Sequence, residues 1–452
     1  MIRRPPRSTP KPSSAASDVY KRQNYIGELF MLSLTRIRNN PDLIKAGLEA
    51  KNESINLDEI LKLDEKHRDN IHQLNEMRAE RNRASEEIAG AKRAGKNSDD
   101  AIAEMKKVSD AIKKLEKEVS ELGKMLDERL DLIPNVPHDT VPVGQDENAN
   151  QVIREWGEPP AADFDLKSHV EIGLELNLFD LERGSKISGS GFPLLTGLGA
   201  KLERVLINYM LDIHVQKHGF TEIFPPFLTR AEAPYTCGQL PKFADDMYYI
   251  EKDDLYLIPT AEVPVTNIFN DEIMDESDLP GNYAAYSACF RREAGSYGKD
   301  THGLLRLHQF NKVEMVKFVE PKTSYDELES ITSQAEEVLQ QLGLHYRVVA
   351  LNTSDLSFAA AKCYDLEVWA PGESKWLEVS SCSNFEDFQA RRGNIRYRRT
   401  IDKKVDFVHT LNGSGLATPR LMVALLETYQ TPDGKVLLPQ VLHELMGQEV
   451  LG

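Results

Sequence analysis

The sequence predicts an α+β fold, in which an antiparallel sheet is flanked by helices and preceded by an N-terminal antiparallel two-helix coiled coil. Three observations support this prediction. Residues 57–133 carry apolar side chains at helical spacing with one interruption. Beyond residue 168, short β-prone runs alternate with helical patterns in hairpin-rich order. No Walker loop or dinucleotide fingerprint precedes a helix, which disfavours a doubly wound parallel sheet.

The first predicted helix begins near Leu57 and ends before the turn-forming residues 94–98, and the second continues to Ile133. Two helices of about 33 residues give a hairpin about 50 Å long. Its apolar seam is narrow and its outside is charged, so by itself it fits a dimerisation rod or a spacer. Arg78 and Arg81 replace leucines in the seam, which weakens packing and favours a polar partner.

The chain divides into four predicted regions. Residues 1–30 are rich in Arg, Pro and Ser, and their prolines oppose the amphipathic helix of a transit peptide. We expect this region to be a disordered or non-native leader before a start at Met31. The helical arm then covers 31–135, a polar proline-containing linker covers 136–168, and the main domain covers 169–452.

Composition limits the classes of function. The net charge of −17 argues against indiscriminate binding to nucleic acid, although local basic clusters remain able to bind it. One such cluster lies in the first helix of the arm: Arg78, Arg81, Arg83, Lys92 and Arg93. No apolar run is long enough to span a membrane, and four scattered cysteines indicate free thiols. We therefore expect a cytoplasmic protein without a membrane partner.

The most informative segment is a predicted strand hairpin that runs from Cys289 to Glu314 around a long polar loop. Period-2 alternation on its second strand places five side chains on one face: Arg306, His308, Phe310, Lys312 and Glu314. The other face carries Leu307, Val313 and Met315 and is predicted to be buried. The polar face is either solvated or lines a polar site. Phe310 and Glu314 lie about 13 Å apart along such a strand, which suits an adenosine monophosphate with a small acyl group.

Two more segments favour the site. Asn412 to Gly415 predicts a Gly-rich turn, after which Thr418 caps a helix with Pro419 in its first turn. Arg420 then lies at the positive end of that helix, where it is expected to share an anion with the helix end. In the β-prone run 376–385, Glu378 is close to several hydroxyls, which suits Mg²⁺ that stays partly bound to nucleotide phosphates.

These segments resemble motifs 2 and 3 of the class II aminoacyl-tRNA synthetases. Phe290 to Glu293 matches the FRxE core of motif 2, and Gly413 to Arg420 matches the GxGxxxxR pattern of motif 3. The helix around Leu206 and the following Gly219–Pro226 segment is similar to motif 1. With the Thr260-Ala261-Glu262 triplet, the pattern is similar to the bacterial seryl-tRNA synthetase family over residues 31–452.

The resemblance implies an ATP-dependent, AMP-forming reaction. L-serine is activated with ATP to seryl-adenylate and pyrophosphate, and serine then passes to the 3′ end of tRNA(Ser), and also of tRNA(Sec). The resemblance further implies a homodimer with motif 1 at the interface, and an arm that holds the long variable arm of the tRNA. For that role the five basic residues of the first arm helix are the candidates.

The same resemblance implies the site residues. The catalytic residues are Arg291, Arg420 and Glu378. The ATP-binding residues are Arg291, Arg292, Glu293, Phe310, Glu378, Val379, Ser380, Ser381 and Arg420. The serine-binding residues are Thr260, Ala261, Glu262, Arg291, Glu314, Asn412 and Ser414. Glu378 and Ser381 bind Mg²⁺ through ATP.

Several alternatives remain open. Strict alternation places Ser380, not Ser381, beside Glu378, so both serines are candidates. Glu314 has a second interpretation, an ion pair with Lys312 or Arg306. His308 is expected to fix neighbouring backbone. Two rival functions are an amino-acid activating enzyme that loads a carrier protein and a non-catalytic coiled-coil scaffold. The long arm argues against the first rival, and the intact set of site residues argues against the second.

Overall fold

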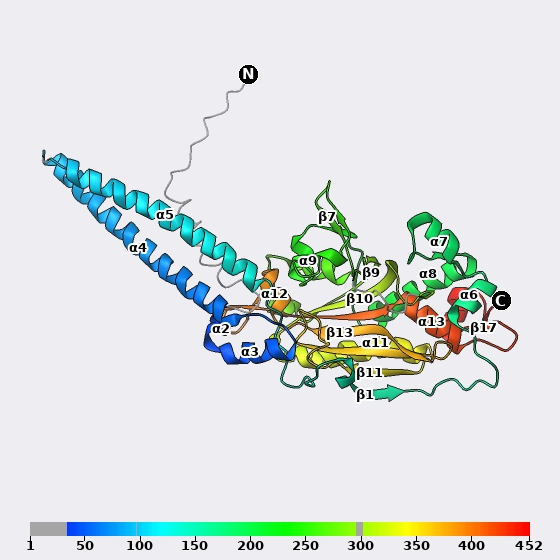
Figure 1. Cartoon of the computed structure of the whole chain (residues 1–452). Coiled ribbons are helices and arrows are strands. Elements are labelled where there is room, and N and C mark those ends of the chain that lie inside the picture. The colour runs from blue at the N-terminus through cyan, green and yellow to red at the C-terminus, as the bar shows by residue number, and fades with distance from the viewer. Residues whose placement is uncertain (1–33, 96, 295–301) are drawn as a thin grey trace, which may run out of the picture. The chain divides into compact units, whose positions relative to one another are not determined.

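The computed structural model describes residues 34–95, 97–294 and 302–452. The predicted leader over 1–30 lies outside the described residues. The chain forms two compact units, one helical and one built on a large sheet. The helical unit extends to residue 133, except for residues 49–52, which belong with the sheet unit from residue 134 onward (Figure 1).

The helical unit contains α2 (Leu34–Asn39), most of α3 (Pro41–Ala50), α4 (Leu57–Arg93) and α5 (Asp99–Leu130). α4 and α5 form the predicted antiparallel hairpin, with 37 and 32 residues (Figure 1). Leu74 packs against Ile112 and Leu115 in the seam. Arg78 is half-buried there and pairs with Glu116 of the opposite helix at 2.7 Å. The prediction of the helical hairpin is confirmed, and this seam arginine has a partner within the hairpin.

An eight-stranded sheet forms the frame of the second unit. Its order is β1 (Gln151–Trp156), β11 (Tyr346–Ala350), β12 (Lys362–Ala370), β13 (Lys375–Asn384), β16 (His409–Ala417), β10 (Gln309–Val319), β9 (Gly281–Phe290) and β4 (Thr221–Ile223). All pairs are antiparallel except β4 with β9. The α+β prediction is confirmed. Strand β1 lies within the predicted linker 136–168 and adds an edge strand to the sheet.

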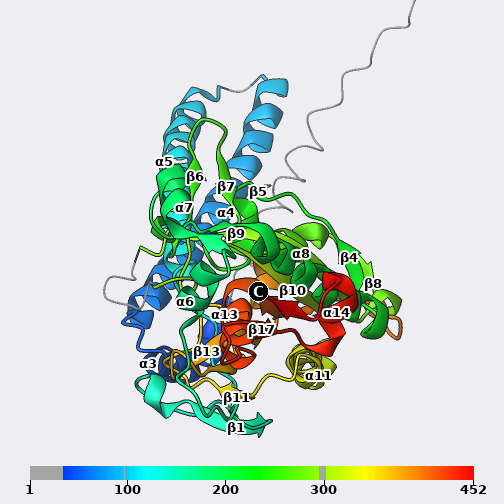
Figure 2. The ribbon, with the colours of Figure 1, turned by 90° about the vertical axis from the view of Figure 1, so that its right-hand side faces the viewer.

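One face of this sheet is buried by helices α8 (Gly197–Asp212), α11 (Ser324–Gln341) and α13 (Thr418–Thr428). Val313 and Met315 of β10 are completely buried in the same apolar cluster as residues of all three helices, as alternation predicts. Lys312 and Glu314 therefore face away from this helical layer, whereas Asn311 and Lys317 bond to Glu203 of α8 and Glu327 of α11. The C-terminal helix α14 (Gln440–Met446) packs beside α8 (Figure 2).

The remaining elements are short. The helices are α6 (His169–Glu175), α7 (Leu181–Ser188), α9 (Glu232–Thr236), α10 (Glu262–Thr266) and α12 (Phe388–Arg392). The small sheets contain β2 (Phe179–Asp180) with β3 (Leu194–Leu195), β5 (Leu228–Thr229) with β7 (Leu255–Leu257) and β6 (Tyr249–Ile250), β8 (Ile273–Asp275) with β14 (Arg396–Arg398) and β15 (Val405–Phe407), and β17 (Val436–Leu437) with β18 (Val450–Leu451). Among the described helices, none combines the length and the apolar character needed to cross a membrane.

Three local predictions need correction. Strand β10 begins at Gln309, so Arg306, Leu307 and His308 precede it. Leu307 is nevertheless buried in the same apolar cluster as Val313 and Met315, as predicted. The predicted turn at 412–415 is part of strand β16. Its glycines are required by packing, because a Cβ on Gly415 would lie 2.6 Å from the His214 ring.

The third correction concerns the start of α13. Thr418 is the first helical residue rather than its cap, and the cap position is Ala417. The Thr418 hydroxyl is engaged elsewhere, because it donates to the carboxylate of Glu203 and lies 3.0 Å from the Asn311 carbonyl oxygen. Pro419 lies in the first turn, as predicted.

Candidate active site

A cavity of about 660 Å³ lies on the polar side of β9, β10, β13 and β16. Eleven of the predicted site residues line it: Thr260, Glu262, Arg291, Glu293, Phe310, Glu378, Val379, Ser381, Asn412, Ser414 and Arg420. Four others do not line it: Ala261, Arg292, Glu314 and Ser380. The fold therefore brings together four segments, 260–262, 291–310, 378–381 and 412–420, which together span residues 260–420 of the sequence.

Arg291 and Phe310 form one wall, at the paired ends of β9 and β10. The Arg291 guanidinium carbon lies 5.2 Å from the centre of the Phe310 ring, within cation–π range. The backbone of Arg291 is fixed by His308, whose Nδ1 lies 2.9 Å from the Arg291 carbonyl oxygen and whose own carbonyl accepts from the Arg291 N–H. The structural role predicted for His308 is confirmed. This wall offers a planar cation beside a flat apolar ring.

Glu293 and Arg292 face different directions although they are adjacent. Glu293 has φ +53°, and its carboxylate pairs with Arg306. Arg292 is exposed, and its backbone N–H donates to the Asp246 backbone carbonyl at 3.0 Å. Of this pair only Glu293 lines the cavity, and the ATP-binding role of Arg292 stays a prediction.

A β-bulge in β13 decides which serine accompanies Glu378. In the pairing of β12 with β13, Leu366 lies opposite Ser380 and the next residue, Glu367, lies opposite Glu378. Val379 of β13 therefore has no partner in β12 and is the extra residue of the bulge. The bulge shifts the alternation, and Glu378 and Ser381 both line the cavity. Ser380 is buried, and its hydroxyl donates to the Ser414 carbonyl at 2.6 Å. A carboxylate beside a hydroxyl is a donor set that fits a hard divalent cation.

Arg420 approaches this pair from the first turn of α13. Its Nη1 donates to the Glu378 carbonyl oxygen at 2.7 Å, and its Nε donates to the Leu305 carbonyl oxygen at 3.2 Å. The guanidinium is therefore fixed by backbone on two sides. Its charge faces the cavity beside the Glu378 carboxylate, 3.5 Å away.

Two buried carboxylates lie at the other end, Glu262 in the lining of the cavity and Glu314 behind it. Glu314 is fully buried behind the wall and accepts from Thr260 Oγ1 at 3.1 Å and from Asn412 Nδ2 at 3.0 Å. It also pairs with Lys312, so the alternative ion pair is present. Glu262 lies beside it, and burial raises the pKa of Glu262 to about 7, with a further contribution from the charge of Glu314.

Two residues that the sequence did not single out complete this end. Gln389 of α12 donates from Nε2 to Glu262 Oε1 at 2.6 Å. Thr410 of β16 donates in turn to Gln389 Oε1 at 2.8 Å. A lone Gln in a short helix gives no local signal of such a role, and its partner is 127 residues away.

The predicted RNA-binding cations lie in the helical unit. Arg83, Lys92 and Arg93 are exposed on α4, whereas Arg78 and Arg81 are half-buried. Arg93 Nε donates to the Ala89 carbonyl within its own helix at 3.2 Å. The exposed members are available to a ligand, and Arg78 is engaged by Glu116.

Comparisons with known proteins agree with this architecture. Residues 244–429 match the tRNA synthetase class II core domain (G, H, P, S and T), and residues 31–137 match the seryl-tRNA synthetase N-terminal domain. A serine–tRNA ligase of Chloroherpeton thalassium is 53% identical over 93% of this chain and 100% of its own length. One from Carboxydothermus hydrogenoformans is also 53% identical, over 92% of this chain and 98% of its own.

A solved structure agrees as well. The seryl-tRNA synthetase of Pyrococcus horikoshii, complexed with ATP, superposes with a TM-score of 0.88 at 40% identity, covering 93% of this chain and 99% of its own. The identity and the coverage confirm the resemblance found in the motifs. The chain therefore belongs to the seryl-tRNA synthetases, the class II enzymes that act as serine–tRNA ligases.

Proposed function

We propose that the cavity binds ATP and L-serine together and joins them as seryl-adenylate, and that serine then passes to the 3′ end of tRNA(Ser). The main support for this proposal is one cavity lined by an arginine–aromatic wall, a carboxylate–hydroxyl pair and the buried Glu262, with Glu314 directly behind the lining. The Pyrococcus horikoshii structure, which is complexed with ATP, supports ATP as the nucleotide.

The nucleotide half uses two arginines. The adenine ring stacks on Phe310, and Glu293 accepts from its amino group. Arg291 grips the α-phosphate, and Arg420 holds the γ-phosphate, since a guanidinium can grip phosphate with two parallel hydrogen bonds. A serine carboxylate oxygen forms a bond to the α-phosphorus while the bond to the bridging oxygen of pyrophosphate breaks. Arg291 stabilises the charge that develops on the α-phosphate in that step.

Glu378 and Ser381 are the residues that would hold Mg²⁺ at the phosphates, and their carboxylate and hydroxyl oxygens suit this hard cation. When bound, Mg²⁺ neutralises phosphate charge. Val379 gives an apolar contact in the same wall. Ser380 acts indirectly here, because its hydroxyl fixes the Ser414 carbonyl.

The amino-acid half recognises both polar ends of serine. Thr260 and Glu262 bind the α-ammonium group, and Ala261 holds them in place from a fully buried position. Glu314 accepts from the serine hydroxyl, with Asn412 and Ser414 closing the pocket. Alanine lacks the hydroxyl and cannot form this hydrogen bond, so it is rejected. Lys312 forms an ion pair with Glu314.

The transfer half needs the tRNA and a second subunit. The exposed cations of α4 contact the tRNA backbone, with tRNA(Sec) as a second substrate. The homodimer forms through motif 1, where Phe224 follows the edge strand β4 and is 74% exposed. This large exposed aromatic side chain suits an interface better than solvent. The enzyme works in the cytoplasm.

Pyrophosphate exchange with a panel of amino acids tests the proposal. We expect exchange that depends on serine and Mg²⁺, with alanine and threonine far weaker. Exchange with serine but no transfer to tRNA would favour a carrier-loading enzyme. Absence of exchange with every amino acid would contradict the proposed chemistry and leave a scaffold role.

A further inference from the structure

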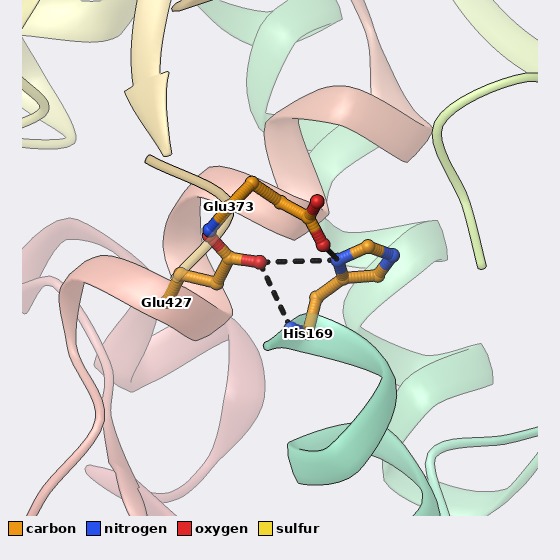
Figure 3. Close-up of side chains that lie close together, drawn as sticks. All are labelled: His169, Glu373 and Glu427. Atoms are coloured by element: carbon orange, nitrogen blue, oxygen red, sulfur yellow. Dashed lines mark hydrogen bonds and ion pairs between the residues drawn. The ribbon is translucent and has the colours of Figure 1, made fainter. Parts of the chain in front are cut away.

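A buried cluster of His169, Glu373 and Glu427 lies outside the cavity (Figure 3). His169 and Glu427 are fully buried, and Glu373 is nearly so. His169 Nδ1 lies 3.0 Å from Glu427 Oε1 and 3.2 Å from Glu373 Oε1. The backbone N–H of His169 also donates to Glu427 Oε1 at 2.9 Å. His and two Glu at these separations have the donor set of a metal site, so the protonation of the ring decides what the cluster does.

The opposite side of the ring determines its tautomer. The backbone N–H of Leu304 donates to His169 Nε2 at 3.1 Å, so Nε2 carries no proton. The single ring proton is then on Nδ1, where it is donated to Glu427. A metal ligand at Nδ1 would require the proton to move to Nε2, directly opposite the Leu304 N–H. The cluster is therefore built as a hydrogen-bonded anchor for Leu304 and not as a metal site.

The turn that this anchor holds reaches the cavity. Leu304 and Leu305 both line it, and the Leu305 carbonyl accepts from Arg420 Nε at 3.2 Å. Gly303 has φ +59°, and a Cβ there would lie 2.2 Å from His169 Nε2, so the turn packs directly on the imidazole. The Leu304 N–H is fixed by His169, and the neighbouring Leu305 carbonyl is bound by Arg420.

The residues that fix the Leu304 N–H and the Leu305 carbonyl are both linked to one helix, α13. Arg420 is in the first turn of α13, and Glu427 is seven residues later, about 10 Å along the helix axis. Glu427 also accepts from the Glu373 N–H at 3.1 Å. α13 therefore binds the 303–305 turn by two routes, directly through Arg420 and indirectly through Glu427 and His169.

We infer that His169 is a positioning residue for Arg420, which sets the orientation of its guanidinium by fixing the Leu304–Leu305 backbone, and that its loss selectively weakens ATP binding. This inference rests on the proposed role of Arg420 at the ATP phosphates. His169 does not line the cavity, and its shortest hydrogen-bonded connection to Arg420 runs through the Leu304 and Leu305 peptides.

Two variants of similar size distinguish the roles of the two ring nitrogens of His169. His169→Asn retains a donor near Nδ1 for Glu427 but does not reach the Leu304 N–H. His169→Gln places an oxygen near Nε2 and keeps the acceptor for Leu304. In pyrophosphate exchange with the full chain, we expect His169→Asn to raise the KM for ATP about five- to tenfold and the KM for serine less than about twofold. His169→Gln should raise the KM for ATP less than about threefold.

A double-mutant cycle tests the route through Arg420. Arg420→Lys keeps the charge but removes the Nε donor to Leu305, and in that background His169→Asn should change the KM for ATP by less than about twofold. Additive effects, or parallel rises in both KM values, would mean that His169 only supports folding. Metal bound stoichiometrically to the purified wild-type protein would also overturn the inference.

Hydrogen exchange gives a readout that does not depend on catalysis. The Leu304 amide should exchange faster in His169→Asn than in the wild type, and His169→Gln should remain close to the wild type. Unchanged protection in His169→Asn would overturn the inference even if the enzyme were inactive. Absence of serine-dependent exchange in the wild type would instead overturn the proposed function.

Discussion

Glu262 and Glu314 are carboxylates in the same buried pocket, but they differ in their partners. Glu314 has Lys312, Thr260 and Asn412, whereas Glu262 has the uncharged donors Gln389 and Asn412. Burial therefore raises the pKa of Glu262 to about 7. We propose that a serine ammonium group supplies a cationic partner for Glu262, so that the two carboxylates bind different parts of one amino acid.

The raised pKa of Glu262 predicts a pH-dependent KM for serine. Only the ionised carboxylate binds the ammonium, and with a pKa of about 7 its ionised fraction falls from roughly nine-tenths at pH 8 to roughly one-tenth at pH 6. The KM for serine should rise about tenfold over this range as pH falls, while the KM for ATP changes little. Pyrophosphate exchange measures both, and a KM for serine that is flat from pH 6 to 8 would refute this assignment. Glu262→Gln should bind serine weakly at every pH.

Replacing Glu314 tests the selection of serine over alanine. Glu314→Gln keeps the size of the side chain but weakens the acceptor for the substrate hydroxyl, so the preference for serine should fall about ten- to a hundredfold. The quantity to measure is the ratio of kcat/KM values for the two amino acids. An unchanged ratio would place hydroxyl recognition elsewhere.

The two serines of β13 form a matched pair of variants. Ser381→Ala should increase the Mg²⁺ concentration needed for half-maximal exchange, because it removes a proposed oxygen ligand. Ser380→Ala should leave that concentration unchanged and lower the melting temperature, because the buried Ser414 carbonyl loses its donor. Equal Mg²⁺ dependence of both variants would contradict the assignment of Ser381.

The choice between Ser380 and Ser381 could be predicted only in part from the sequence. The motif pattern predicted that a polar strand end faces the site, but alternation alone favoured Ser380. The choice depends on one extra residue, Val379, in a bulge that no local signal announces. His169 was missed for a different reason, since its backbone partner Leu304 lies 135 residues away and only the fold brings them together.

At the level of elements, strongly periodic segments were predicted well. α4 and α5 have the expected lengths, and β13 coincides closely with the predicted run 376–385. The Gly-rich segment at 412–415 was predicted as a turn because glycine usually marks one. Here Gly413 and Gly415 lie in a central strand, where Cys382, Ile331 and His214 leave no room for a side chain. Tertiary packing overrides the local preference at these positions.

The arm gives a prediction at this scale. Replacing Arg83, Lys92 and Arg93 together by Glu should reduce tRNA charging at least about tenfold and leave serine-dependent pyrophosphate exchange unchanged, because these exposed side chains lie outside the cavity. The loss should shrink as the salt concentration rises, because the wild type makes more phosphate contacts than the variant and its affinity therefore falls more steeply with salt. Lys106, Lys113 and Lys114 of α5, replaced in the same way, are the matched control. An equal loss in both triple variants would indicate general electrostatic repulsion and not a specific surface of α4.

At the scale of the whole molecule, the chain combines a helical unit and a sheet unit with separate proposed tasks. The family membership follows from motifs that were visible in the sequence and from relatives that match along nearly the whole chain. The roles of individual residues depend on details that the fold adds, such as the β13 bulge and the His169 anchor.

Transfer of labelled serine to a total tRNA pool by this chain, with ATP and Mg²⁺, tests the proposed activity as a whole. We predict that serine is attached only to tRNA species that accept serine, and that Arg420→Ala abolishes most of this transfer. Alanine and threonine should not be attached. Absence of serine transfer by a folded wild-type protein, with tRNA shown to be chargeable by another seryl-tRNA synthetase, would contradict the account.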